Sequence, residues 1–223
     1  MTLKRVLEPE LIESEADALE YAAIDRAEVS AAFADLVADE LGFRGGSVID
    51  LGAGPCDIPL AICRRIKGAK ITAVELSPAM LGLAAENIAR ARLGGRITLL
   101  RGDAKRTKLP AGSFDLVICN NLVHHFSDPY PLFCEAARLC RPGGGLLLRD
   151  LRRPRTLAEL DGHIRRIAGV NTPRQQQLLR NSLRAALTAA EAGVYARMAG
   201  LDDLILKEEG LKHWQLQRAA GRR

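Results

Sequence analysis

Short apolar runs alternate with longer amphipathic segments along the chain from residue 47 onward. The short runs are rich in aliphatic and β-branched residues, which is typical of buried strands. Because single helices fit the segments between them, the pattern predicts βαβ crossovers and a parallel sheet. The predicted strands are residues 47–51, 71–76, 96–100, 114–120 and 146–150.

Helix start and stop signals support this alternation. A helix over residues 58–67 follows Asp57, which is placed as its N-cap, and a second begins at Ser77-Pro78 and continues through Ala91. The segment DPYPLFCEAARLCRPGGG predicts a third helix, capped at its start and ended by proline and three glycines.

Two mainly helical stretches lie outside this alternation. Residues 10–41 predict two helices that cover one side of the sheet. Residues 155–200 predict a helical insertion with a break from Gly169 to Pro173. The predicted division of the chain is a helical N-terminal cap over residues 1–44 and a main domain over residues 45–223.

The last segment predicts a β-hairpin over residues 201–219. Its strands are 201–209 and 211–219, and the turn falls at Gly210. The predicted fold class is therefore α/β: a doubly wound, Rossmann-like and mainly parallel seven-stranded sheet, with an antiparallel terminal hairpin and the helical N-terminal cap.

The composition of the 223 residues, 48% hydrophobic and 26% charged, is that of a folded globular protein. No apolar run approaches the ~20 residues of a membrane span, and the first residues lack the apolar core of a signal peptide. The spacing of the five cysteines fits neither a zinc site nor a disulfide framework. These observations predict a cytoplasmic protein without membrane contact and leave its oligomeric state open.

Charge is unevenly distributed along the chain. Residues 1–43 carry a net charge of −8, residues 44–137 carry +4 and residues 138–223 carry +9. A basic C-terminal part is compatible with nucleic-acid binding, but the acidic N-terminal part argues against a uniformly basic surface that binds a phosphate backbone. Solvated helix faces are the favoured interpretation.

A glycine loop, Asp50-Leu51-Gly52-Ala53-Gly54-Pro55-Cys56-Asp57, follows the first predicted strand. Gly52 and Gly54 allow a tight turn and close approach of a ligand to the backbone. A dinucleotide loop requires glycine at position 57, where this chain has an anionic Asp57, and no Gly-Lys-Ser/Thr of a Walker loop follows. The loop therefore predicts a nucleoside ligand without phosphates, with Asp50 available to a cationic group.

This loop resembles the acid-x-Gly-x-Gly-x-Gly motif of class I S-adenosylmethionine-dependent methyltransferases, with Cys56 in place of the third glycine. Further similar motifs follow in order: Glu75 at the end of the second strand, Asp103 after the third, FDLVICNNLVHHF and LCRPGGGLLLRD. The resemblance covers about residues 45–150. It implies that Glu75 binds the ribose hydroxyls, that Asp103 binds the adenine amino group and that the sheet ends in an antiparallel strand.

The resemblance implies S-adenosyl-L-methionine as the cofactor. Tyr21 is included in the predicted cofactor site because cap aromatics often close over the cofactor in similar enzymes. The predicted cofactor-binding residues are Asp50, Gly52, Ala53, Gly54, Glu75, Leu76, Asp103, Ala104, Asn120 and Tyr21.

His124 and His125 are the catalytic candidates. Methyl transfer depends mainly on alignment of the reacting groups, and a general base is needed only where the acceptor must lose a proton. One histidine can serve as that base; alternatively, one packs under the cofactor and the other faces solvent. Because adjacent side chains diverge, the pair is a poor chelate, and no metal is predicted.

Residues after the fourth and fifth strands are the substrate candidates: Asn121, Arg149, Arg152 and Arg153. Arginines in this place predict an acceptor with a negative charge, since they bind carboxylate or phosphate through paired hydrogen bonds. Only Asp150 offsets their charge locally in the sequence. A solvated loop is the alternative.

Three functions remain open. The favoured one is methyl transfer to a small molecule, because the cap and the helical insertion can enclose a pocket. An RNA methyltransferase is supported only by the basic C-terminal part, and few aromatic residues are available to stack bases. A non-catalytic protein that binds the cofactor, or uses the fold as a scaffold, is the third; binding without turnover would distinguish it.

Overall fold

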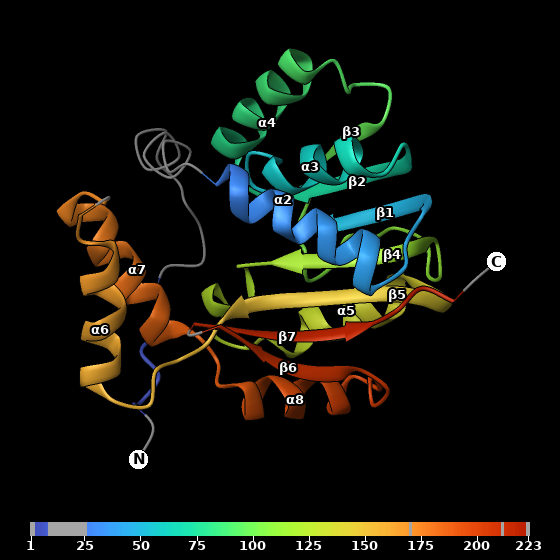
Figure 1. Ribbon diagram of the computed structural model, residues 1–223. Coiled ribbons are helices and arrows are strands. Elements are labelled where there is room, and N and C mark those ends of the chain that lie inside the picture. The colour runs from blue at the N-terminus through green and yellow to red at the C-terminus, as the bar shows by residue number, and fades with distance from the viewer. Residues whose placement is uncertain (1–2, 9–25, 170, 211, 222–223) are drawn as a thin grey trace.

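The computed structural model describes residues 3–8, 26–169, 171–210 and 212–221 of the chain. Within them, seven strands form one sheet in the order β3-β2-β1-β4-β5-β7-β6 (Figure 1). The strands from β3 to β5 are parallel, whereas β7 is antiparallel to both β5 and β6. Their bounds are β1 Gly45–Leu51, β2 Gly68–Glu75, β3 Ile97–Arg101, β4 Phe114–Asn120, β5 Cys140–Leu151, β6 Ile205–Glu209 and β7 His213–Arg218.

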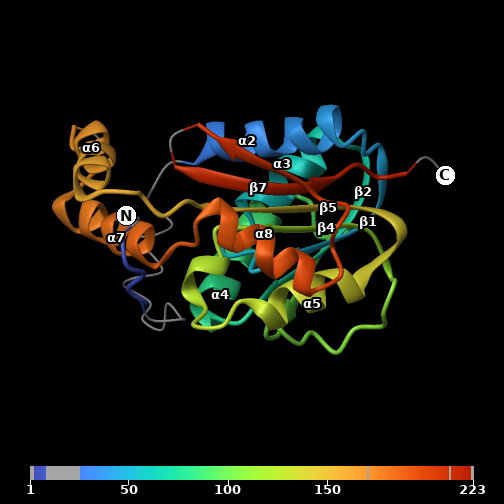
Figure 2. The ribbon, with the colours of Figure 1, turned by 90° about the horizontal axis from the view of Figure 1, so that it is seen from below.

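Helices cover both faces of the sheet. Apolar residues of α2, α3 and α4 join the core on one face, and those of α5 and α8 join the core on the other. Figure 2 shows α2 and α3 opposite α5 and α8. The bounds are α2 Ala27–Asp35, continued by the π-helical η1 Leu36–Glu40, then α3 Asp57–Arg65, α4 Pro78–Ala91, the 3-10 turn η2 Val123–His125, α5 Tyr130–Leu139, α6 Leu157–Ile167, α7 Pro173–Ala185 and α8 Ala189–Met198.

The two-residue period of the strands produces these two cores. Val48 and Leu116 belong to the core under α2, α3 and α4, whereas Ile49 and Val117 belong to the core under α5 and α8. All four side chains are fully buried. A strand buried on both faces is a nearly continuous apolar run, which is why the sequence pattern located these strands.

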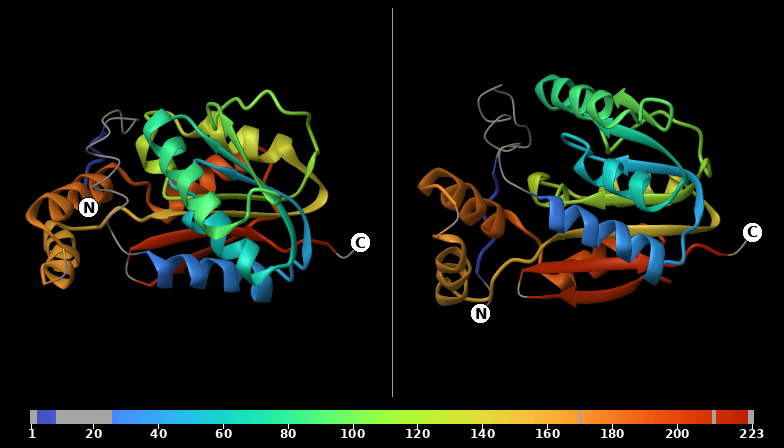
Figure 3. Two further views of the ribbon diagram at one scale, coloured as in Figure 1. Left: turned by 90° about the horizontal axis from the view of Figure 1, so that it is seen from above. Right: turned by 45° about the horizontal axis from the view of Figure 1, so that its top comes forward.

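A third, smaller core lies beyond the end of the sheet. Leu151, Leu160, Ile164, Leu183 and Ala186 pack there, and they attach α6 and α7 to the end of β5. Figure 3 shows α6 and α7 standing beyond the arrowheads of β4 and β5, where the parallel strands have their carboxyl ends. The helical insertion therefore lies at the end of the sheet where ligands of such folds bind.

The predicted fold class is confirmed, including the antiparallel hairpin. The predicted break between two helices of the insertion is also confirmed, since α6 ends at Ile167 and α7 begins at Pro173. Of the two helices predicted over residues 10–41, α2 and η1 lie in the described part, whereas residues 9–25, with Tyr21, lie outside it. The division into cap and main domain stays a prediction.

Three local predictions are wrong. β5 begins at Cys140, not at residue 146, because Cys140 and Gly145 pair with β4 through backbone groups that no apolar pattern reveals. The N-cap of α3 is Cys56, and Asp57 is the first helical residue. The first strand of the hairpin begins only at Ile205, since the preceding residues form a turn.

Candidate functional site

The order of the strands reverses between β1 and β4, and a cleft opens where their carboxyl ends meet the adjoining loops. Crossover connections leave β1 and β4 in opposite directions, so the loops after them separate at this point. The predicted site residues that line the cleft are Gly52, Gly54, Glu75, Leu76, Asp103, Ala104, Asn121 and His125.

The glycine loop folds back onto β2. The N–H groups of Gly52 and Ala53 both donate to the carbonyl of Val74, at 2.9 and 3.0 Å. Gly52 has φ +78°, and a Cβ placed on it would lie 2.6 Å from Cδ2 of Leu122, which lines the cleft. The backbone conformation and the lack of space thus both require glycine at this position.

We expect Gly52→Ala to lower the free energy of unfolding by about 1–2 kcal/mol, because alanine is strained at positive φ and displaces Leu122. Thermal melting measures the effect. Gly82→Ala is the matched control, since Gly82 is exposed on α4 with nothing within 4 Å of an added Cβ. Equal melting temperatures for Gly52→Ala and the wild type would contradict this prediction.

Cys56, at the position of the third glycine of the motif, adopts φ +67° and is fully buried. Burial raises the pKa of its thiol, and the nearby Asp50 carboxylate adds to this effect. The residue therefore carries a neutral thiol in a left-handed backbone conformation that favours glycine.

Glu75 connects the end of β2 to the glycine loop. One carboxylate oxygen accepts from the N–H of Gly54 at 2.9 Å, and the other accepts from the N–H groups of Leu76 and Ser77, both at 2.9 Å. Three backbone donors hold this side chain at the edge of the cleft. Glu75 is thus oriented before any ligand arrives.

Asp50 lies beneath the glycine loop at the end of β1, with only 2% of its surface exposed. Burial, followed by the charge of the nearby Glu75, raises the pKa of Asp50 from 3.8 to about 8. Near neutral pH the acid is therefore mostly protonated. A cationic ligand group placed beside it would favour the ionised form.

Asp103 and Asn121 lie on the cleft wall in loops after β3 and β4. Asp103 accepts from the N–H of Lys105 at 2.8 Å, which closes a short turn. Asn121 has φ +53°, and its Oδ1 is buried without a hydrogen-bond partner in the described part of the chain. A buried acceptor of this kind is costly unless a ligand or water satisfies it.

A buried histidine-carboxylate pair lies behind the cleft. Nδ1 of His124 is 2.5 Å from Oδ1 of Asp150, at the end of β5. Burial disfavours the charged imidazolium, but the Asp150 carboxylate outweighs burial and raises the pKa of His124. Burial likewise opposes ionisation of Asp150, yet His124 lowers the pKa of this carboxyl.

The expectation that the adjacent histidines diverge is wrong. The rings of His124 and His125 lie 4.2 Å apart, because the 3-10 turn η2 brings both toward Glu8 of the N-terminal segment. Oε1 of Glu8 is 3.2 Å from Nδ1 of His125 and 3.5 Å from Nε2 of His124. Burial raises the pKa of Glu8.

The arginines predicted to bind the substrate have acidic partners in the fold. Arg149 pairs with Glu209, Arg152 with Glu208 and Arg153 with Glu191. Arg149 also donates to Oδ1 of Asn120, and neither residue lines the cleft. Asp150 was the only acid found near these arginines in the sequence, and the fold adds acids from β6 and α8.

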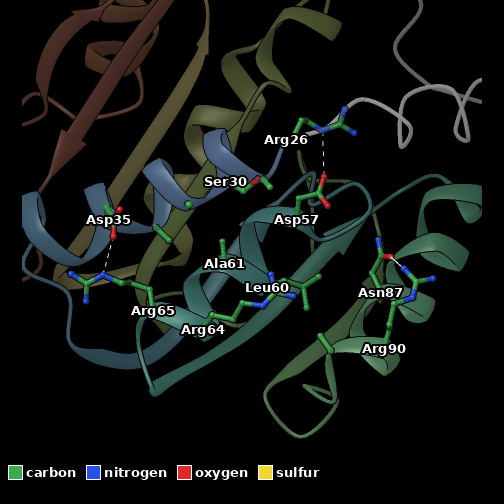
Figure 4. A pocket seen from close by; sticks show the side chains of 14 residues that line it. Arg26, Ser30, Asp35, Asp57, Leu60, Ala61, Arg64, Arg65, Asn87 and Arg90 are labelled. Atoms are coloured by element: carbon green, nitrogen blue, oxygen red, sulfur yellow. Dashed lines mark hydrogen bonds and ion pairs between the residues drawn. The ribbon is translucent and has the colours of Figure 1, made fainter. Parts of the chain in front are cut away.

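A second, larger cavity of about 670 Å³ lies on the outer surface of the helix layer (Figure 4). Its lining comes from α2, α3 and α4 and the residues beside them, and Figure 4 shows two ion pairs within it, Arg26 with Asp57 and Arg65 with Asp35. The cleft of about 90 Å³ at the strand ends is smaller. Its position at the switch point, not its size, makes it the candidate site.

The sequence missed several residues of the site. Ser77, Met80, Leu122 and Phe126 also line the cleft, and their positions just after strands β2 and β4 were a usable signal. Glu8 gave no such signal, because it lies far from the histidines along the chain. The predicted site residues of the described part that do not line the cleft are Asp50, Ala53, Asn120, His124, Arg149, Arg152 and Arg153.

Comparison with known proteins shows which family this arrangement of strands and loops resembles. The family model "Methyltransferase domain" matches residues 49–148. The ubiquinone biosynthesis O-methyltransferase of Xanthomonas oryzae pv. oryzae is 31% identical over 125 residues, which cover 53% of this chain and 48% of that protein. The chain thus spans about half the length of the curated relatives it matches.

Solved structures share the fold over nearly the whole chain. A protein from Methanococcus maripaludis, described as an S-adenosyl-L-methionine-dependent methyltransferase, has a TM-score of 0.72 at 19% identity, covering 98% of this chain and 99% of that chain. A SAM-dependent methyltransferase from Aquifex aeolicus has a TM-score of 0.66 at 16% identity, covering 92% and 97%. At these identities the likeness shows the fold alone.

The strand order, the glycine loop at the switch point and the family match define a class I methyltransferase domain. Residues 49–148 match this family where the ordered motifs predicted a resemblance to S-adenosylmethionine-dependent methyltransferases. S-adenosylmethionine is the methyl donor of this family. No helix in the described part of the chain is both long and apolar enough to cross a membrane.

Proposed function

We propose that this chain catalyses methyl transfer from S-adenosylmethionine to a hydroxyl group of a small molecule. The observation that carries the proposal is the Glu75 carboxylate, which three backbone N–H groups hold between the glycine loop and the cleft. The oxygen acceptor is supported by the name of the Xanthomonas relative, an O-methyltransferase.

Two features of the cleft fit the methyl donor. The buried Oδ1 of Asn121 is a hydrogen-bond acceptor to which a donor group of a ligand can bind. The loop at Gly52 and Gly54 exposes backbone without a Cβ, so a nucleoside can approach it closely. When bound, S-adenosylmethionine supplies an electrophilic methyl group on a cationic sulfur.

Each acid at the cleft has a proposed role. The two carboxylate oxygens of Glu75 accept from the two ribose hydroxyls, and Asp103 accepts from the adenine amino group. Asp50 faces the cationic methionyl end, which favours its ionised form. Together these acids fix the position and direction of the donor, and alignment is the main source of rate in this reaction.

The proposed acceptor site lies between the cleft and the helices α6 and α7. Arg5 holds the N-terminal segment there, because its guanidinium donates to the carbonyls of Ala185 and Phe126 at 2.6 and 2.7 Å. His125 lines the cleft, and Asp150 orients His124 behind it. We propose that His125 contacts the acceptor hydroxyl and that the helices exclude water from it.

Isothermal titration calorimetry tests the donor site, and transfer of a labelled methyl group tests the reaction. We expect S-adenosylmethionine and S-adenosylhomocysteine to bind one per chain and NAD not to bind. With labelled donor, the methyl group should appear in small-molecule acceptors that carry a hydroxyl group, and not in analogues that lack it. Heat with NAD and none with S-adenosylmethionine would refute the donor site. Label in RNA would favour the RNA methyltransferase, and binding without transfer to any acceptor class would favour a non-catalytic protein.

A further inference from the structure

Three potential metal ligands from distant parts of the chain converge beside the cleft: Glu8, His124 and His125. Their ligand atoms all lie within 4.8 Å of one another. We propose that these three side chains bind a divalent transition-metal ion, for which Zn²⁺ is the best match. Zinc binding requires neither the methyl donor nor an acceptor, so this inference stands apart from the proposed reaction.

Two of the three ligand separations suit tetrahedral coordination. Oε1 of Glu8 lies 3.2 Å from Nδ1 of His125 and 3.5 Å from Nε2 of His124. Zinc binds histidine nitrogen and carboxylate oxygen at ~2.0–2.1 Å, which places neighbouring ligands of a tetrahedron about 3.3–3.4 Å apart. Zinc binding therefore requires the two imidazole nitrogens, which lie within 4.8 Å of each other, to adopt a similar separation.

Hydrogen bonds to residues outside the cluster orient two of the three ligands, His124 and Glu8. Nδ1 of His124 pairs with the Asp150 carboxylate, which directs the lone pair of Nε2 toward Glu8. Backbone N–H groups of Val123 and Leu151 in turn hold Asp150, each at 2.6 Å. A metal-bound histidine that donates its other ring nitrogen to a carboxylate is a general feature of zinc sites.

Glu8 also has a hydrogen-bond partner outside the cluster. The hydroxyl of Ser182, on α7, lies 3.1 and 3.2 Å from its two carboxylate oxygens and can donate to either. Arg5, which anchors the same segment, brings positive charge near the histidines, but its guanidinium is directed at backbone carbonyls. The two carboxylates of Glu8 and Asp150 offset that charge at the site.

Ligand chemistry selects the metal. Two imidazole nitrogens and one carboxylate favour zinc and similar transition metals, whereas Mg²⁺ and Ca²⁺ prefer oxygen ligands throughout. Three protein ligands leave a fourth coordination position for water or substrate, as in catalytic zinc sites. His125 also lines the cleft, so that position can be reached from the acceptor side.

The test measures zinc binding by the metal-stripped full chain, with its affinity tag removed and Cys134, the one cysteine that is not buried, changed by Cys134→Ser. Competition with a chromophoric chelator gives affinity and stoichiometry, and X-ray absorption identifies the ligands. We expect one zinc per chain with nitrogen and oxygen at ~2.0–2.1 Å and no sulfur at ~2.3 Å.

Variants then assign the ligands. Glu8→Gln and His125→Ala should each weaken zinc binding at least tenfold, and Asp150→Asn should weaken it about 10- to 100-fold. His163→Gln, on α6 outside the cluster, is the control and should bind zinc as the parent does. Glu8→Gln changes only one atom of the side chain, and melting curves establish that each variant is folded.

Two results would overturn the proposal. One is a folded parent chain that binds no zinc at micromolar concentrations, which would mean that the cluster holds only a proton. The other is zinc binding that Glu8→Gln and His125→Ala leave unchanged, or a sulfur-containing ligand shell.

Discussion

Replacing Glu75 by alanine is expected to weaken S-adenosylmethionine binding by about 2–4 kcal/mol, roughly 30- to 1000-fold in Kd. Two charge-assisted hydrogen bonds to the ribose are lost. The loop is also affected, because the same carboxylate accepts the N–H groups of Gly54, Leu76 and Ser77. Calorimetric titration of wild type and variant with S-adenosylmethionine measures the change.

Glu75→Gln separates the two contributions of this side chain. The amide keeps one oxygen acceptor and nearly the same shape, so it should cost less binding free energy than alanine. Glu86→Ala is the matched control, since Glu86 is exposed on α4 away from the cleft. If Glu75→Ala binds the donor with the Kd of the wild type, Glu75 is not a ribose ligand.

Replacing Asp50 by asparagine is expected to stabilise the ligand-free protein at pH 7 by about 2–4 kcal/mol. The folded chain holds the Asp50 proton up to a pKa of about 8, whereas the unfolded chain releases it near 3.8. Between these values the unfolded state binds fewer protons, so the free energy of unfolding of the wild type falls as pH rises. Asparagine has no proton to release, and the variant lacks this decline.

Thermal melting between pH 4 and pH 8.5 measures this difference. The melting temperature of Asp50→Asn should exceed that of the wild type by about 5–15 °C at pH 7 and by little at pH 4. The variant should also bind S-adenosylmethionine more weakly, because the acid facing the cationic end of the donor is gone. Parallel pH profiles of Asp50→Asn and the wild type would contradict the raised pKa.

Local sequence was sufficient to bring together the residues of the proposed donor half of the site. Glu75 ends a strand and Gly52 and Asp103 each follow one, and parallel strands place their carboxyl ends along one edge of the sheet. Once the strands were recognised from their apolar runs, these residues had to lie close together. The cleft contains all three.

The acceptor half depends on contacts between distant residues, which no local pattern contains. Glu8 meets His125 across about half of the chain, and Arg153 meets Glu191 on α8. The sequence pattern could not predict the early start of β5 for a related reason, since Gly145 pairs with Leu116 through backbone groups alone. The hydrophobic periodicity of a sequence indicates which side chains are buried, whereas these contacts depend on hydrogen bonds and charge.

The hydrogen bond from Arg5 to Ala185 joins residues 180 positions apart. A ribosome delivers the N-terminal part of a chain first, so this bond cannot form until α7 has been made and has folded. The strands from β1 to β5 are complete before that point in the order of synthesis. The donor half can therefore assemble on the nascent chain, while the acceptor half, which needs Glu8 and α7 together, is completed only after nearly the whole chain has emerged.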